Sequence, residues 1–273
     1  MGDIRSGELE SIEYFYELIA QLKKIKRKLL TNCYLSQDKL MESIQRQEIV
    51  FEYSHNKYLN IFVDDDGFKR LYYYIADIDN YIVEDQEGKI VCDIFQNGMN
   101  EESERVINTL IKCGFNQYAC FNKWVKQIKS IEPYEERADV CIRNTFDEEV
   151  IGWLYENFDR YTDCLPRKTE VDDFIKNMQF TCAYDTTTGK LVGSLICSKK
   201  RKACLTEEYL FVDMSERGRG ISNSLYEYCY HRYSNIGYKY NAWIRSDNVP
   251  CIVLHERLDY SLDEMKKITF LKG

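Results

Sequence analysis

The amino-acid sequence predicts a mixed α/β (α+β) protein with a mixed sheet, built from two domains. Segments with helical spacing of apolar residues alternate with short strand-like segments along the chain, which indicates that class. The chain has 273 residues, 44% hydrophobic, 30% charged and only 3 Pro, so it is long enough for two cores at about 150 residues per domain. Its 22 Tyr also favour sheet, because tyrosine packs well on strands.

The first half opens with a predicted helix over Glu8–Leu30, whose apolar residues repeat at helical spacing. A meander follows, because apolar alternating segments are separated by turn residues such as Asp64-Asp65-Asp66-Gly67. A second helix over Glu101–Lys112 ends near Gly114. The predicted strands of this half are Ile49–Tyr53, Leu59–Val63, Arg70–Ala76, Ile90–Phe95 and Phe115–Val125.

The pattern breaks around Pro133, among charged residues, and this break predicts a domain boundary with domains over 1–134 and 135–273. The second half alternates strands and helices again. Its predicted strands are Asp139–Arg143, Phe180–Asp185, Leu191–Ser198, Leu205–Met214, Tyr238–Ile244 and Lys267–Leu271, and its predicted helices are Glu148–Phe158, Val171–Met178, Ile221–Ser234 and Val249–Leu258.

Charge and cysteine content exclude several classes of protein. The net charge of −8 repels phosphate backbones, so we expect no nucleic-acid partner. No apolar run approaches the roughly 20 residues that span a bilayer, and no secretory signal pattern is present, so we expect a cytoplasmic protein without a membrane partner. The 11 Cys include no CxxC pair and only 3 His accompany them, so we expect core thiols and no metal site.

The most informative stretch is a strand that runs into Arg217-Gly218-Arg219-Gly220 and then opens a helix at Ile221-Ser222. Helix starts carry unpaired N–H groups, and glycines let a ligand approach the backbone closely, so this turn suits a pyrophosphate. The spacing fits neither a Walker loop nor a dinucleotide fingerprint.

At these residues the chain resembles the GCN5-related N-acetyltransferase (GNAT) family, whose signature for binding acetyl-CoA is [R/Q]-x-x-G-x-[G/A]. Arg217, Gly220 and Ser222 occupy its three defined positions. A second family block, Asn-x-x-Ala-x-x-Leu-Tyr-x-x-x-Gly-Phe, is followed at the same spacing by Asn248, Cys251, Leu254, His255, Asp259 and Tyr260. The resemblance covers about residues 139–273 and implies an acyl-CoA N-acyltransferase-like fold there.

The resemblance also implies a set of cofactor-binding residues and acetyl-CoA as cosubstrate. The strand residues Leu210, Phe211 and Val212 would contact the acetyl and pantetheine portions. The pyrophosphate would lie on Arg217, Gly218, Arg219, Gly220, Ile221 and Ser222, and Asn248 would hold the cofactor arm.

Two residues are candidates for proton transfer. In many family members a Tyr acts as the general acid at the position that His255 occupies here, and histidine can donate a proton near neutral pH. The alternative is that His255 is a helix residue that only packs against the sheet. Some members use a strand Glu as base at the position of Thr206. Glu208 lies one pleat further on the same face, whereas strict alternation turns Glu207 away. Glu208 is therefore either the base or part of the pocket wall.

We therefore expect an acetyl-CoA-dependent N-acetyltransferase that acetylates a primary amine, on a small molecule or a peptide, by direct transfer in a ternary complex. A non-catalytic acyl-CoA-binding or regulatory protein, and an interaction module without cofactor, are the alternatives. The first half lacks both family blocks, but its ending Leu110 to Phe115 is similar to the family's last helix and Gly-Phe turn. We expect a degenerate GNAT-like domain there, and an unrelated α+β cap is the alternative.

Overall fold

A computed structural model describes residues 4–98, 100–201 and 203–273, and their helices and strands form two compact units. The N-terminal unit comprises residues 1–120 and 265–273, and the C-terminal unit comprises residues 121–264. Two strands, β7 (Asn116–Gln127) and β13 (Ser261–Lys272), contribute to both units. The other elements of the N-terminal unit are β1 (Ile4–Glu8), α1 (Ile12–Ile25), β2 (Leu30–Thr31), α2 (Gln37–Gln45), β3 (Ile49–Ser54), β4 (Tyr58–Asp64), β5 (Lys69–Ile75), β6 (Ile90–Asn97) and α3 (Glu101–Lys112).

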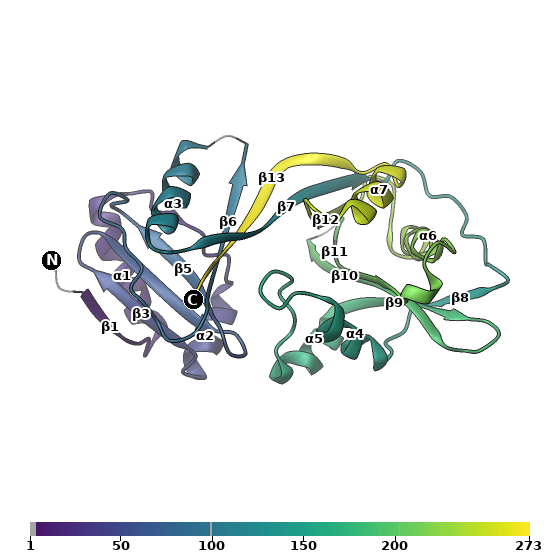
Figure 1. Cartoon of the computed structure of the whole chain (residues 1–273), viewed down its shortest axis with the longest axis horizontal. Coiled ribbons are helices and arrows are strands. Elements are labelled where there is room, and N and C mark those ends of the chain that lie inside the picture. The colour runs from purple at the N-terminus through teal and green to yellow at the C-terminus, as the bar shows by residue number, and fades with distance from the viewer. Residues whose placement is uncertain (1–3, 99, 202) are drawn as a thin grey trace. The chain divides into compact units, whose positions relative to one another are not determined.

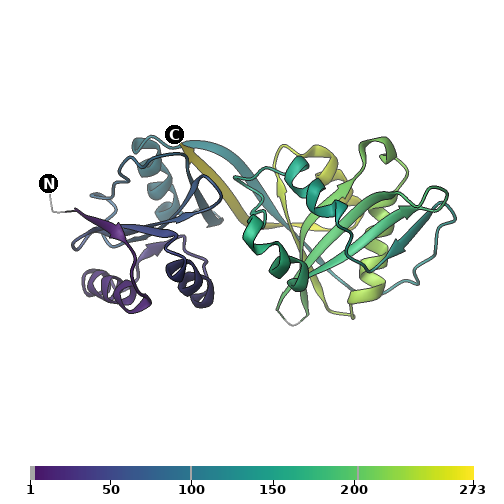
Figure 2. The same ribbon diagram turned by 90° about the horizontal axis from the view of Figure 1, so that it is seen from below.

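The N-terminal unit is a sheet with helices on both faces. Its strands follow the order β1-β3-β4-β5-β6-β13. Figure 2 shows α1 and α2 on one face of this sheet and α3 on the other. Strand β4 serves both layers, because alternate residues point to opposite faces: Leu59 and Ile61 pack with α1 and α2, while Tyr58 and Phe62 pack in the cluster that contains α3.

The long helix expected over Glu8–Leu30 is shorter in the structure, and one helix was missed. Helix α1 ends at Ile25, and Leu30 then pairs with Ile75 as part of a short strand. The apolar residues after Ile25 keep the helical spacing in the sequence, although the backbone there is no longer helical. The missed helix, α2, begins at Gln37, directly after Ser36, whose side chain caps it, and it buries Leu40 and Ile44.

The parallel strands β5 and β6 pair only briefly and then part, and Asn32 fills the space between them. The pairing covers Lys69↔Ile90 and Arg70↔Val91. Beyond it, the Asn32 amide donates to the carbonyls of Leu71 at 3.1 Å and Asp93 at 2.9 Å, and its oxygen accepts from the Tyr73 N–H at 2.8 Å. We call the place where two parallel strands part a fork. The buried Asn32 side chain takes the place of the missing backbone hydrogen bonds and bridges β5 and β6 at their fork.

Replacing Asn32 with alanine is expected to destabilise the protein by about 3 kcal/mol, because three buried backbone groups lose their partner. Urea unfolding measures this loss. Thr31→Ala is the matched control, since Thr31 is exposed and its hydroxyl accepts from the Cys33 N–H without touching the carbonyls that Asn32 bridges. Equal stability of both variants would show that Asn32 does not hold the fork closed.

The C-terminal unit has the same layered plan, with the strand order β7-β12-β11-β10-β9-β8. Buried side chains of α6 and partly buried side chains of α7 pack on one face, and buried side chains of α4 and α5 pack on the other. Figure 1 labels these elements. Their bounds are β8 (Val140–Arg143), α4 (Glu149–Asn157), α5 (Val171–Asn177), β9 (Met178–Asp185), β10 (Leu191–Arg201), β11 (Cys204–Val212), α6 (Ile221–Tyr233), β12 (Lys239–Arg245) and α7 (Val249–Arg257).

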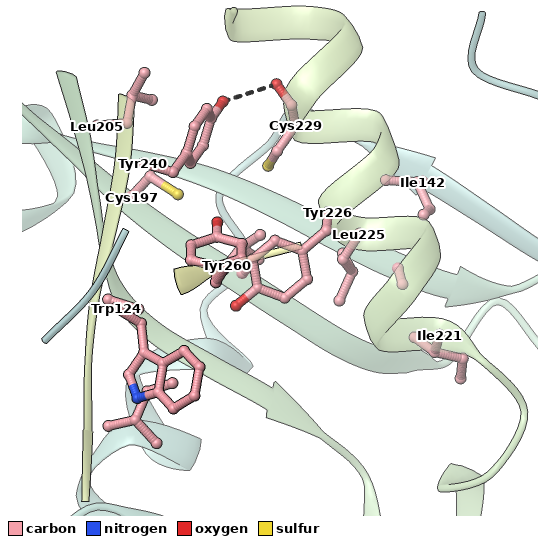
Figure 3. Close-up of a cluster of buried hydrophobic side chains, with 14 of the residues drawn as sticks. Trp124, Ile142, Cys197, Leu205, Ile221, Leu225, Tyr226, Cys229, Tyr240 and Tyr260 are labelled. Atoms are coloured by element: carbon pink, nitrogen blue, oxygen red, sulfur yellow. Dashed lines mark hydrogen bonds between the residues drawn. The ribbon is translucent and has the colours of Figure 1, made fainter. Parts of the chain in front are cut away.

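The core under α6 fixes the start of this helix against the sheet. Figure 3 shows the side chains that pack between α6 and the strands, namely Ile221, Leu225, Tyr226 and Cys229 from the helix and Leu205, Cys197, Trp124 and Tyr240 from the sheet. The Tyr240 hydroxyl also donates to the Cys229 carbonyl at 3.2 Å. A Cβ at Gly193 would lie 3.0 Å from Ile221 Cγ2, so this glycine lets α6 approach β10 closely.

The division between the two units differs from the boundary expected at 134/135. The units divide between Cys120 and Phe121, inside β7, and residues 265–273 at the end of β13 belong to the N-terminal unit. The break in pattern around Pro133 is the loop from β7 to β8 and lies within the C-terminal unit. A continuous strand gives no turn signal, so the sequence pattern cannot show where it passes from one unit to the next.

Candidate functional site

The candidate site of the C-terminal unit lies where the parallel strands β11 and β12 part. Their pairing runs from Cys204↔Lys239 to Glu207↔Ala242, although both strands continue further. Two cavities open here. The first, which we call the glycine-loop cavity, is about 540 Å³. The second, which we call the glutamate cavity, is about 270 Å³. They share three lining residues, Leu210, Asn248 and Cys251.

The turn between β11 and α6 forms one wall of the glycine-loop cavity. Gly218 (φ +84°) and Gly220 (φ +77°) adopt left-handed backbone, which favours glycine, and Gly220 is the N-cap of α6. The first turn of an α-helix has N–H groups without intrahelical acceptors and carries partial positive charge. This cavity can therefore bind a phosphate group at the helix start.

Arg137 holds this turn in place through a hydrogen bond to its backbone. The sequence analysis did not identify this residue. Its Nη1 donates to the Arg219 carbonyl at 2.7 Å, and its Nε and Nη2 donate to Asp139 at 2.9 and 2.7 Å. A Cβ at Gly220 would lie 3.4 Å from Arg137 Nη1. Arg137 lies in the irregular segment before β8, where no motif marked it.

Most of the sequence-predicted cofactor residues line the glycine-loop cavity together. These are Leu210, Val212, Arg217, Gly218, Gly220, Ile221, Ser222 and Asn248. The two others lie elsewhere. The Phe211 ring packs on Trp153, 4.5 Å between centroids, because alternation turns it to the α4 face. The Arg219 guanidinium pairs with Asp139 at 2.9 Å, with Asp185 at 3.5 Å and with Glu216, so it stabilises the turn instead of facing the cavity.

Glu207 and Glu208 both line the glutamate cavity, and the expectation that Glu207 faces away was wrong. The cause is a β-bulge: Cys197 pairs with Glu207 while the adjacent Ile196 pairs with Tyr209, which leaves Glu208 as the extra residue. Strict alternation therefore fails at this point. Glu208 is half-buried and accepts a hydrogen bond from the Ser198 hydroxyl.

Glu207 is buried at the centre of a hydrogen-bonded network. Its Oε2 lies 3.0 Å from His255 Nε2 and accepts from the Tyr226 hydroxyl at 2.9 Å, while its Oε1 accepts from the Tyr260 hydroxyl. Burial and the charge of Glu207 raise the pKa of both tyrosines well above the ordinary value, so both remain donors. Three donors leave this carboxylate little capacity to accept another hydrogen bond.

His255, on α7, is a buried imidazolium paired with Glu207. Its Nδ1 lies 2.8 Å from the Cys251 carbonyl, which only accepts, and its Nε2 faces the carboxylate, so both ring nitrogens carry hydrogen. Burial lowers the pKa of His255, but the hydrogen bonds to Cys251 and Glu207 and the Glu207 charge outweigh it and raise the pKa to about 10. Another cation, Lys126 of β7, lies over the Tyr260 ring at 6.0 Å.

The comparisons with known proteins agree with this geometry. The model of the Acetyltransferase (GNAT) family matches residues 134–260, so this part of the chain is a GNAT-family domain. The fold of the chain is similar to that of a tandem GNAT protein from the clavulanic acid biosynthesis pathway, at TM-score 0.63 and 11% identity, with 98% of each chain covered. No curated protein sequence gives a significant match.

Two further solved structures share the fold. A GCN5-related N-acetyltransferase from Sphaerobacter thermophilus has TM-score 0.56 and 10% identity, over 98% of this chain and 95% of its own. A conserved protein from Enterococcus faecalis V583, described as a probable N-acyltransferase, has TM-score 0.55 and 10% identity, over 99% of this chain and 72% of its own. The chain therefore has a GNAT-type fold along its length, including its N-terminal half.

Among the residues that the structure describes, no helix is both long and apolar enough to cross a membrane. No cluster of three or more His, Cys, Asp or Glu side chains suited to a metal ion occurs in the same part of the chain.

Proposed function

We propose that the protein is a cytoplasmic, acetyl-CoA-dependent N-acetyltransferase that acetylates a primary amine by direct transfer in a ternary complex. One observation carries this proposal: the two cavities meet at Leu210, Asn248 and Cys251. A donor bound in the glycine-loop cavity and an amine bound in the glutamate cavity would meet at these residues. Holding both reactants together is itself a large part of catalysis.

The residues of the glycine-loop cavity fit acetyl-CoA. The first turn of α6 and the Arg217 guanidinium would hold the pyrophosphate, and Leu210 and Val212 lie along β11 where backbone groups can meet the pantetheine arm. Asn248 caps α7, its Oδ1 accepting from the Cys251 N–H at 3.3 Å, and lines both cavities. When bound, acetyl-CoA supplies the thioester that the amine attacks.

Glu208 is the proposed base and His255 the proposed acid. Glu208 lines the glutamate cavity and is less buried than Glu207, whose oxygens already accept from His255, Tyr226 and Tyr260. It would accept the proton that the amine loses. His255 holds a proton at neutral pH, and Cys251, beside its ring, lines the donor cavity.

The acceptor is proposed to be a positively charged small molecule or the amino group of a peptide. The carboxylates of Asp159, Asp163, Glu207 and Glu208 line the glutamate cavity against the cations of Arg245 and His255. This excess of carboxylates attracts an ammonium group. With a net charge of −8 on the chain, we propose neither a nucleic acid nor a membrane as partner.

A second candidate function is acyl-CoA binding without catalysis. It is favoured by one observation: both N–H groups of His255 already have acceptors, the Cys251 carbonyl and Glu207. The discriminating experiment is release of free thiol from acetyl-CoA with a panel of primary amines. Amine-dependent release supports the enzyme, whereas acetyl-CoA binding without release by any amine supports the second candidate.

Replacing Gly220 with aspartate is expected to weaken acetyl-CoA binding about 100-fold or more, because it adds a side chain at φ +77° and a negative charge at the helix start. Arg217→Ala should weaken binding by about 10-fold through loss of one phosphate contact. Titration calorimetry measures both. Gly152→Asp in α4 is the matched control, since a Cβ there meets nothing within 4 Å. Wild-type affinity in Gly220→Asp would remove the basis for this donor site.

A further inference from the structure

Cys251 lies at the junction of the two cavities with its sulfur beside a paired imidazole. It belongs to the first turn of α7, which begins at Val249, and it lines both the glycine-loop cavity and the glutamate cavity. Its Sγ is 3.6 Å from His255 Nδ1, and His255 Nε2 is 3.0 Å from Glu207 Oε2. Thiol, imidazole and carboxylate therefore follow one another in contact.

This order of groups is the arrangement that activates a cysteine nucleophile. The thiolate is the nucleophilic form of cysteine, and a neighbouring cation stabilises it. Because His255 already carries hydrogen on both ring nitrogens, the thiol proton passes to water and the imidazolium stays beside the thiolate. Here Glu207 orients His255, and the buried tyrosines Tyr226 and Tyr260 fix Glu207 in turn. A thiolate at Cys251 would lie beside the imidazolium N–H of His255, which stabilises negative charge.

Three other cysteines of the chain, one exposed and two buried, lack this setting. Cys92 and Cys182 are buried, and burial raises the pKa of Cys182 to about 11 and that of Cys92 well above its ordinary value. Cys164 is exposed, but it lines neither the glycine-loop cavity nor the glutamate cavity. Of these thiols, only Cys251 combines access to the donor cavity with a neighbouring imidazole.

We propose that Cys251 accepts the acyl group of a bound acyl-CoA and carries it as a thioester. This inference rests on the proposed function for its donor site. The Cys251 thiolate attacks the thioester carbonyl carbon, a new carbon–sulfur bond forms, and the bond to the CoA sulfur breaks. The CoA thiolate leaves with the proton from the His255 imidazolium, so charge and protons balance.

The acylated Cys251 faces the glutamate cavity, because the residue lines both cavities. A neutral amine there attacks the carbonyl carbon, the bond to Cys251 Sγ breaks, and the amide leaves. The amine proton returns to His255, which restores the thiolate and the imidazolium. This covalent route adds to direct transfer from the same donor site and needs no other reactant.

The test is intact-protein mass spectrometry after incubation with acetyl-CoA and no amine, quenched in acid within seconds. We expect a mass increase of one acetyl group that neutral hydroxylamine removes, as it removes a thioester but not an amide. Cys251→Ala and Cys251→Ser should lose the thioester. Cys164→Ser, which removes an exposed thiol outside the cavities, should keep it.

Two results would overturn the proposal: no adduct on wild-type protein that binds acetyl-CoA by calorimetry, or an adduct of equal yield on Cys251→Ala. Amine-dependent thiol release by Cys251→Ala would then confirm that direct transfer survives, so that only the covalent route has failed. If wild-type protein does not bind acetyl-CoA at all, the donor site fails and the covalent route fails with it. His255→Gln should also lower the yield of adduct, by at least 10-fold, because the thiolate loses its neighbouring cation and the CoA thiolate loses its proton donor.

Discussion

Replacing Glu208 with glutamine is expected to lower kcat for amine acetylation by about 100-fold or more, because general bases contribute on that scale. Glutamine has the same size and can accept a hydrogen bond from Ser198, but it cannot take a proton at neutral pH. Glu208 lines the glutamate cavity and not the glycine-loop cavity. The affinity for acetyl-CoA should therefore stay within about twofold of wild type, since no donor contact is changed.

Steady-state kinetics with a saturating donor measures this loss, and calorimetry measures the donor affinity. Glu227→Gln is the matched control, because Glu227 is an exposed residue of α6. If Glu208→Gln kept the wild-type kcat, Glu208 would not be the base and would only form part of the pocket wall.

Replacing Glu207 with alanine is expected to destabilise the protein by about 3–5 kcal/mol. Removing one partner of a buried ion pair leaves the other charge uncompensated. The side chains of Glu207 and His255 are 4% and 2% exposed, and the two tyrosine hydroxyls would lose their acceptor as well. Denaturant unfolding measures the loss, and Glu227→Ala is the matched surface control.

The pair should also make stability depend on pH. The folded state holds the His255 proton more tightly than the unfolded state, since its pKa is raised from 6.5 to about 10. The stabilisation is therefore complete below about pH 6.5 and is lost as pH rises toward 10. His255→Gln should remove this decline between pH 7 and 9, by thermal unfolding across that range. An unchanged decline would show that other groups cause it.

Regular elements with strong local signals were predicted well from the sequence. Helix α3 has the predicted bounds, Glu101–Lys112, because acidic residues at its start and Gly114 after its end mark both limits. Helix α2 was missed, since its polar surface and its length of 9 residues give a weak periodic signal. The apolar residues after Ile25 extended the helical spacing into a short strand.

The site was predicted in part, and the failures have physical causes. Glycine and helix-start signals are local, so the turn from Arg217 to Ser222 could be identified before its surroundings were known. Glu207 was misplaced because a β-bulge depends on the partner strand, which a single segment does not reveal. Arg137 supports the turn from a segment 82 residues away, and no spacing rule reaches that far.

The two units use the same parallel fork differently. In the N-terminal unit the buried Asn32 bridges β5 and β6 where they part. In the C-terminal unit two cavities occupy the fork between β11 and β12. We therefore expect the N-terminal unit to bind no acetyl-CoA, which agrees with the absence of both family sequence blocks from residues 1–134.

The most direct test of a single donor site at the fork of β11 and β12 is the stoichiometry of acetyl-CoA binding by titration calorimetry. The structure predicts one molecule bound per chain, and none bound by Gly220→Asp over the same concentration range. Two molecules per chain, or binding that survives Gly220→Asp unchanged, would contradict the assignment of the donor site to this fork.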